Sequence, residues 1–273
     1  MPPRPEITLR FVLVLLSSLL LEASVAVPRA EAKRKSTPSK GIRRIELKKV
    51  RTIVIDPGHG GDNLGTRSIY GVLEKRITLR VALKLAAHLR ETTRARVLLT
   101  RESDKPLSLR ERIEFANRAG ADVFLSLHCN SDPKHRGTGI ETFFLSLKAS
   151  DAEALKLAHR ENGAELFTLP VQESPNEIQG ILTQLQHVQA HTFSFHLATA
   201  ILAALVKETK WRNRGVKQAP FGVLRHAQMP AIVVEMGFLS HPDEAKKLLD
   251  DAVQERIAAA LVRGIELFDK KIR

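Results

Sequence analysis

Three apolar runs of the sequence end on a side chain that can bind a metal or move a proton. His59 follows the first run, His128 ends a later one, and Glu235 ends the last. Ligands of open α/β sheets bind outside the carboxyl ends of the strands, so these residues would meet at one edge of a sheet. Glu74 starts an amphipathic stretch, after a loop long enough to fold back beside His59. Two histidines and one glutamate form the ligand set of several catalytic zinc sites, with the fourth position left for water.

The elements that must position these residues follow a regular rhythm from Thr52 onward. Apolar runs alternate with amphipathic stretches, which predicts an α/β sheet domain. The predicted strands span 52–56, 95–100, 122–128, 139–145 and 231–235. Helices are predicted between the first two strands, at 107–119, through most of 149–210, and from Asp250 to the carboxyl end. The first helix has apolar side chains on one stripe, namely Ile77, Val81, Leu85 and Leu89.

Residues 1–32 show the pattern of a secretory signal peptide. Arg4 and Arg10 precede the apolar run 11–21, and small residues follow it. A run of this length is too short to span a bilayer as a helix. An uncleaved membrane anchor is the alternative. Export would place the protein in a periplasm, or at the wall outside a single-membrane cell.

The formal net charge of +13 is concentrated in residues 33–51, which carry nine basic residues and one acidic residue. This Ser/Thr/Pro/Lys-rich stretch is predicted to be a linker, and residues 52–273 a single domain. The linker is either a solvated tether or a segment weakly attracted to anionic lipid or wall polymer. Because the domain itself is only modestly basic, nucleic-acid binding is not expected. The single cysteine, Cys129, excludes an internal disulfide.

Four motifs occur in order along the domain: DPGHGG, GVLEK, LSLRERIEFANRAGADVFLSLHCNS and MPAIVVEMGFLSHPDE. Together they resemble the zinc-dependent N-acetylmuramoyl-L-alanine amidases of the type called amidase 3, over essentially all of 52–273. The resemblance implies a mixed, mostly parallel twisted sheet flanked by helices, of phosphorylase/hydrolase-like architecture. It implies zinc ligands at His59, Glu74 and His128, and a catalytic carboxylate at Glu235. The implied substrate is peptidoglycan, at the amide between N-acetylmuramic acid and L-alanine.

This ligand set suits amide hydrolysis, which needs a strong nucleophile and a polarised carbonyl. Zinc provides both, because it lowers the pKa of bound water towards about 7 and acts as a Lewis acid. Glu235 would then take the proton of the water and return it to the leaving amine.

Other polar residues are weaker candidates. Asn117 and Arg225 lie within the motifs and either orient the substrate or make structural hydrogen bonds. Cys129 adjoins a proposed ligand, but neighbours in a strand face opposite ways, so we predict a packed thiol. His187 and His191 have the spacing of a metalloprotease helix without its glutamate, which favours ordinary helix-face histidines.

The helical segment 161–197 is long enough to be a regulatory lid. Some members of the family that act in cell division carry a helix here that covers the zinc and is displaced by an activator protein. A lid would need a side chain for the open coordination position, and Glu173 and Glu177 are the predicted carboxylates. The alternative role of Glu177 is to form a capping box with Ser174 at a helix start.

Two other functions remain open at this level. A zinc carboxypeptidase-like peptidase would use the same metal chemistry, but its His-x-x-Glu ligand pair is absent after His59. A non-catalytic wall-binding module would retain the fold with a vestigial site, against which the presence of all four chemical residues argues.

Overall fold

The structure is a computed structural model that describes residues 44–163 and 177–272, with the backbone alone for 177–188. Its elements are β1 (Thr52–Pro57), α1 (Glu74–Thr92), β2 (Arg96–Leu99), α2 (Leu109–Arg118), β3 (Val123–Asn130), β4 (Ile140–Leu145), α3 (Ala152–Asn162), α4 (Glu177–Thr209), β5 (Asn213–Ala219), η1 (Gly222–Leu224), β6 (Ala231–Phe238), α5 (Pro242–Leu249) and α6 (Asp251–Lys271). Every predicted strand is present within a few residues of its expected bounds. The signal peptide predicted for 1–32 and most of the linker predicted for 33–51 lie outside the described residues.

The strands form one six-stranded sheet in the order β2-β1-β3-β6-β4-β5. Only the β4–β6 pair is antiparallel, while β1 pairs in parallel with β2 and β3, β3 with β6, and β4 with β5. The predicted mixed, mostly parallel sheet is therefore confirmed. The central strands β3 and β6 are buried along their whole length, as expected of strands covered on both faces.

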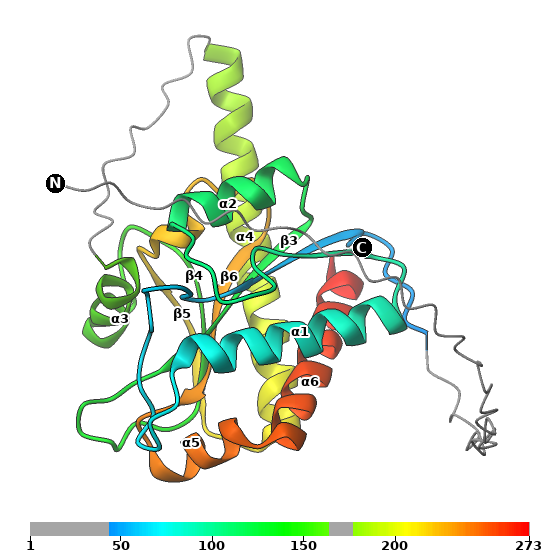
Figure 1. Cartoon of the computed structure of the whole chain (residues 1–273). Helices are drawn as coiled ribbons and strands as arrows, with labels where there is room; N and C mark the ends of the chain where they lie inside the picture. Colours follow the sequence, from blue (N-terminus) through cyan, green and yellow to red (C-terminus); the bar gives the residue numbers. More distant parts are fainter. Residues whose placement is uncertain (1–43, 164–176, 273) are drawn as a thin grey trace, which may run out of the picture. The chain divides into compact units, whose positions relative to one another are not determined.

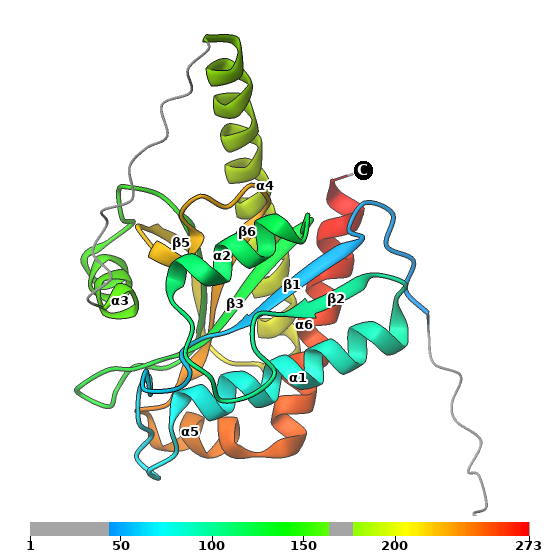
Figure 2. The same ribbon diagram turned by 45° about the horizontal axis from the view of Figure 1, so that its top comes forward.

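Helices cover both faces of the sheet (Figures 1 and 2). Helices α1, α4 and α6 pack on one face, where the predicted stripe of α1 is fully buried in the larger apolar cluster. Helices α2 and α3 and the short η1 turn cover the other face, around Ile113, Phe143, Leu157 and Phe221. The two layers fix the sheet between them, so that its strand ends form a rigid edge.

Helix boundaries follow the local sequence. Ser108 and Glu111 form a complete capping box at the start of α2, and Asp250 caps α6 through the backbone N–H of Val253. The amino-terminal part of α4 extends beyond the sheet (Figures 1 and 2). Residues Gln189–Thr209 of α4 are long and apolar enough to cross a membrane by composition, with a mean hydropathy of 1.3. Because Leu197, Ile201 and Leu205 are buried in the core, this stretch is explained as a core helix.

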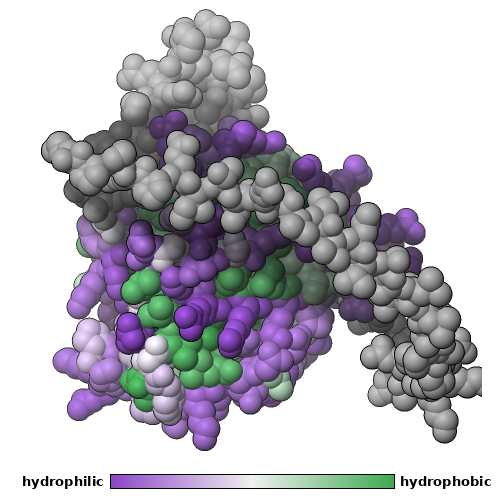
Figure 3. Space-filling view, viewed as in Figure 1, coloured by the Kyte–Doolittle hydropathy of each residue, from purple (hydrophilic) through white to green (hydrophobic). Residues whose placement is uncertain are grey.

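The face seen in Figure 3 is largely hydrophilic, with apolar patches over α1 and the loop before it. The exposed large apolar side chains of this region are Leu64, Ile69, Tyr70 and Leu83. Exposed apolar side chains are common on folded protein surfaces.

Candidate metal centre and active site

Two buried guanidinium groups hold the turn that carries His59. Arg101 donates from Nε to the Pro57 carbonyl at 2.9 Å and from Nη2 to the Gly58 carbonyl at 2.8 Å. Arg112 donates to the carbonyl of His59 itself at 2.7 Å. Burial, with repulsion from Arg112, lowers the pKa of Arg101 to about 10. The clamp is needed because His59 has a φ of 61°, a left-handed conformation that is uncommon outside glycine.

Asp56, at the end of β1, holds the same turn through Arg112. Its carboxylate accepts hydrogen bonds from Arg112 at 2.7 Å, Thr100 at 2.5 Å and Ser126 at 2.7 Å, and is fully buried. Burial alone would raise the pKa of Asp56, but the charge of Arg112 and these hydrogen bonds lower it. Since Ser126 lies on β3, the network joins the end of β1, which precedes the His59 turn, to β3, which carries His128.

Two glycines leave room for the ligand side chains. A Cβ on Gly58 would overlap the imidazole ring of His128, and one on Gly65 would lie 2.6 Å from Cδ2 of His59 and 2.7 Å from Oε2 of Glu74. The glycines of this loop therefore serve the packing of the site rather than phosphate binding.

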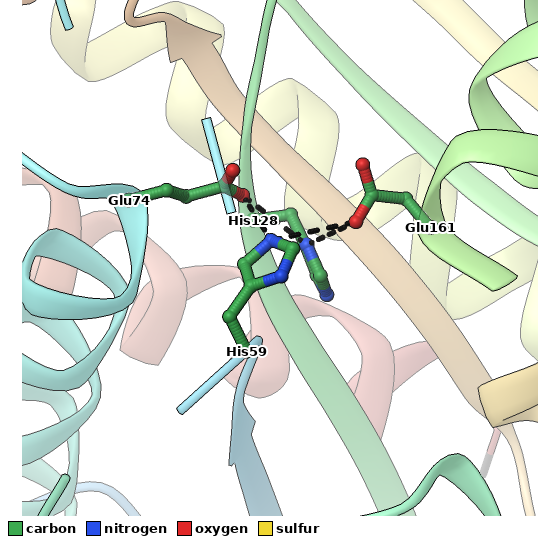
Figure 4. Close-up of side chains that lie close together, drawn as sticks. All are labelled: His59, Glu74, His128 and Glu161. Carbon is green, nitrogen blue, oxygen red and sulfur yellow. Dashed lines mark ion pairs between the residues drawn. The ribbon is translucent and has the colours of Figure 1, made fainter. Parts of the chain in front are cut away.

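Four side chains converge at the carboxyl edge of the sheet (Figure 4). Nε2 of His59 lies 2.9 Å from Oε1 of Glu74, and Nδ1 of His128 lies 3.2 Å from the same oxygen. Oε2 of Glu161, from the last turn of α3, lies 3.4 Å from the first nitrogen and 3.2 Å from the second. One ligand atom from each residue falls within 4.8 Å of all the others. The structure thus brings together the three predicted ligands and adds Glu161.

Hydrogen bonds to residues outside the metal group orient these ligands. Nδ1 of His59 lies 2.8 Å from Oδ1 of Asn63, which leaves Nε2 directed at the centre. Glu74 accepts the backbone N–H of Cys129 at 2.9 Å and that of Thr66 at 2.8 Å. Such outer partners fix ring orientation and ligand basicity in metal sites.

The group fits a metal ion. Within the described part of the chain, His59 Nε2, His128 Nδ1 and Glu161 Oε2 are buried and make no hydrogen bond of proper geometry, although they lie close to charged partners. Burial by itself would lower the pKa of His128, but Glu161 and Glu74 raise it well above its usual value. Likewise, the histidines overcome burial and hold the pKa of Glu74 well below its usual value. This negative field favours any positive charge at the centre, including a divalent cation.

Glu235 stands next to this centre with no hydrogen bond to either oxygen among the described residues. It lies on β6 as the Cα partner of His128 and is fully buried. Burial is the largest cause that raises the pKa of Glu235 well above its usual value, and the charges of Glu161 and Glu74 add to it. A carboxyl group with a raised pKa in a metal centre is suited to accept and return a proton.

A cleft of about 760 Å³ opens beside the centre. His59 and Glu161 form part of its wall, with Leu64 from the loop before α1 and Leu107 from the loop before α2. Its size falls in the usual range of ligand sites. The metal group is therefore reachable by a substrate of some length.

The remaining candidates lie elsewhere. Asn117 donates to the His226 carbonyl at 2.9 Å and accepts from the N–H of Gln228, which ties α2 to the loop before β6. Neither Asn117 nor Arg225 lines the cleft, and a role in orienting substrate stays a prediction for both. Cys129 is buried in the core and outside the metal group, as predicted.

The described residues include the side chain of one helix-face histidine, His191, and neither side chain of the two lid carboxylates. His191 packs edge-on against Phe144, with ring centroids 5.0 Å apart, as an ordinary helix-face residue. Glu173 and the side chains of Glu177 and His187 lie outside the described residues. Glu161 is the carboxylate that sequence reasoning missed, since it entered only as the first residue of the lid segment.

Buried histidines and glutamates beside an unpaired carboxylate, at the carboxyl edge of a mixed sheet, define a candidate metallohydrolase of the α/β class. Residues 53–267 match the family described as N-acetylmuramoyl-L-alanine amidase. The chain belongs to this family, and it is accordingly an amidase, a hydrolase of peptidoglycan. The resemblance found in the four motifs is thus confirmed.

Individual relatives agree with this assignment. AmiA of Escherichia coli K12, an N-acetylmuramoyl-L-alanine amidase, is 33% identical over 217 residues, which cover 79% of this chain and 75% of AmiA. AmiC of Escherichia coli O6:H1 is 30% identical over 219 residues, covering 79% of this chain and 52% of AmiC.

Solved structures share the fold. The N-acetylmuramoyl-L-alanine amidase from Clostridium difficile 630 superposes with a TM-score of 0.60 at 29% identity, over 80% of this chain and 96% of that one. The CwlD amidase from Clostridioides difficile, solved in complex with the GerS lipoprotein, gives a TM-score of 0.60 at 25% identity, over 82% and 100% of the two chains.

Proposed function

We propose that the chain cleaves the amide between N-acetylmuramic acid and L-alanine with one zinc ion, held by His59, Glu74 and His128. The observation that carries this proposal is the convergence of two buried imidazole nitrogens and a carboxylate oxygen on one point. Among the described residues, His59 Nε2 and His128 Nδ1 have no hydrogen-bond partner of proper geometry. Two histidines and a carboxylate leave one coordination position open, which is the arrangement of catalytic rather than structural zinc sites.

The chemistry divides between the ion and the protein. Bound zinc would polarise the scissile carbonyl and acidify water. Glu235 takes a proton from the attacking water, whose oxygen forms a bond to the carbonyl carbon. As the C–N bond breaks, Glu235 returns that proton to the nitrogen, so the products are a carboxylic acid on the sugar and a free amine on L-alanine. The raised pKa of Glu235 suits both transfers.

Glu161 gives the lid hypothesis a specific carboxylate. It approaches the centre from α3, opposite Glu74, and its other oxygen is bonded to Nε of Arg160 at 2.9 Å (Figure 4). A carboxylate here would compete with water for the fourth position, so the resting enzyme would be slow until α3 moves Glu161 away from the centre. The complex of the CwlD amidase with a lipoprotein supports an activator protein as the partner that would move it.

This regulation is tested by Glu161→Gln, with Glu114→Gln on the exposed face of α2 as the control. A neutral amide at this position competes less well for a cation, so the resting rate on purified wall should rise about 3- to 10-fold with unchanged zinc content. A rate equal to that of both the wild type and the control would contradict the lid. Loss of zinc would instead make Glu161 a permanent ligand.

Export through residues 1–32 would bring the enzyme to its polymer, either in a periplasm or at an external wall. There it would serve wall remodelling or the separation of daughter cells. Residues 33–51 would then act as a basic tether, with weak attraction to an anionic surface.

Mass spectrometry of digested peptidoglycan tests the reaction itself. Free stem peptide beginning with L-alanine, beside intact glycan, is the expected product, and it should disappear in chelator. Cleavage within the stem would indicate a peptidase, and binding without any product would indicate a wall-binding module.

A further inference from the structure

Part of the wall of the cleft beside the metal group is apolar. Its large apolar lining residues, within the described part of the chain, are Leu64, Leu107 and Leu109. Leu109 packs against the apolar cluster around α2, whereas Leu64 and Leu107 belong to neither core cluster of the described residues. Leu64 is 40% exposed and Leu107 is half-buried. Packing of the core therefore does not explain these two leucines.

The loop that carries Leu64 is fixed next to the proposed zinc ligands. The Leu64 carbonyl accepts the backbone N–H of Lys75, the residue after Glu74, at 3.4 Å. The following residue, Gly65, lies so close to the centre that an added Cβ would be 2.6 Å from Cδ2 of His59. An ordered loop therefore presents Leu64 to the cleft, beside two ligands.

The loop that carries Leu107 adjoins the first loop and is tied to the same turn. The backbone N–H of Gly61 donates to Oδ1 of Asp104 at 2.8 Å, which joins the two loops. Nη2 of Arg112 donates to the Leu107 carbonyl at 3.1 Å and to the His59 carbonyl at 2.7 Å. One buried guanidinium group thus fixes both the ligand turn and the backbone of Leu107.

An apolar surface held beside a reaction centre is suited to bind apolar groups of the substrate. Contact with such a group removes both apolar surfaces from water, which is favourable. Two methyl groups flank the amide of the proposed substrate, one on the lactyl ether of the sugar and one on L-alanine. They are the apolar groups nearest to the scissile bond.

We propose that Leu64 and Leu107 bind a methyl group next to the scissile amide and so determine part of the substrate specificity. The inference rests on the proposed function, because it assigns this part of the cleft to atoms that adjoin the cleaved bond. Enclosing one methyl group contributes about 4-fold or more to kcat/KM. The enzyme therefore discriminates against a substrate that lacks this methyl group.

The test measures kcat/KM on three compounds. The reference is an N-acetylmuramoyl-L-alanyl peptide, the second compound has glycine in place of L-alanine, and the third has a glycolyl ether in place of the lactyl ether. The wild type should cleave at least one demethylated compound about 4-fold or more less efficiently than the reference. The preference is the ratio of two such values. Comparing it between proteins cancels differences in the intrinsic reactivity of the amides.

Leu64→Ala is compared with a matched control, Leu83→Ala. Leu83 is also 40% exposed, but it lies on α1 and does not line the cleft. Leu64→Ala should lower the preference to about half of the wild-type ratio or less. Leu83→Ala should retain the preference, and so should Leu64→Met, which nearly conserves the apolar volume. Zinc content should be equal in all four proteins, because none of these changes touches a proposed ligand.

The inference is overturned if the wild type cleaves all three compounds equally well, or if Leu64→Ala keeps the wild-type preference. The poorer demethylated compound identifies the source of the methyl group. Failure of the proposed function is distinguishable, because the wild type would then cleave none of the three. NMR titrations would in that case compare their binding. A preference for the reference that is lost in Leu64→Ala would support the inference, and equal ratios in both proteins would reject it.

Discussion

The β3–β6 and β4–β5 halves of the sheet place the same residue type in opposite surroundings. Glu235 on β6 and Glu141 on β4 are Cα partners, and both are buried. Glu141 forms ion pairs with Arg214 and Lys217 and accepts a hydrogen bond from Asn130, whereas neither oxygen of Glu235 has a hydrogen bond within the described residues. Burial therefore raises the pKa of Glu235, while Glu141 serves as a fixed counterion.

This difference shows that the reactivity of a buried carboxylate depends on the partners it lacks. A paired carboxylate is stabilised as an ion and moves protons poorly at neutral pH. An unpaired one costs stability but is available for proton transfer. The two halves thus combine a reactive edge with an adjoining charged edge, and four predictions test that difference.

The largest expected effect is loss of the metal from the β3–β6 half. His59→Ala, Glu74→Ala and His128→Ala each remove one of the three proposed ligands and should abolish zinc binding and activity, with the fold retained. Zinc content of the purified proteins is measured by elemental mass spectrometry. Full occupancy in all three variants would reject the ligand assignment.

Glu235→Gln should keep the metal and lose about 100- to 10,000-fold in kcat, because an amide cannot shuttle the proton. Glu141→Gln on the neighbouring strand is the matched comparison and should retain kcat within a factor of about ten, since Glu141 does not touch the reacting atoms. Steady-state kinetics on a defined muropeptide measures both. If Glu235→Gln kept more than about a third of the wild-type rate, proton transfer would belong to another group.

Asp56→Asn should destabilise the metal half by about 3–5 kcal/mol at neutral pH, because Arg112 loses its buried partner. The pKa of Asp56 is lowered in the folded state, so its stabilisation is present above the unfolded value of about 3.9 and is lost as pH falls through the folded value. Urea unfolding of both proteins across pH measures this. The difference in the free energy of unfolding between wild type and variant should become smaller in acid. A difference that stays constant with pH would contradict the assigned charge interaction.

The smallest effects concern stability and have opposite signs. In chelator at neutral pH, Glu141→Gln should lower the free energy of unfolding by about 1–3 kcal/mol, since it removes the charge that Arg214 and Lys217 face. Glu235→Gln should raise the free energy of unfolding by about 1 kcal/mol, because it removes an unpaired buried carboxylate. Changes of the same sign in urea unfolding would show that the two sites do not differ as described.

The sequence predicts the apolar strands and the ligands at their ends, because burial on both faces produces continuous apolar runs. Strand β5 was not predicted, because its sequence NRGVKQA is polar and it lies at the edge of the sheet. Glu161 was not predicted as a site residue either, because it lies among polar residues at the end of α3 and contacts the histidines only in the folded structure. Its sole local signal is its place at the start of the lid segment.

The clamp of Arg101 and Arg112 has a consequence for how the enzyme responds to its metal supply. Because these side chains hold the His59 turn in its left-handed conformation, folding itself orders this part of the site. In small zinc domains without such support, metal binding and folding are one transition. The clamp therefore predicts that this chain folds without zinc, and that enzyme stripped by chelator regains activity when zinc is returned.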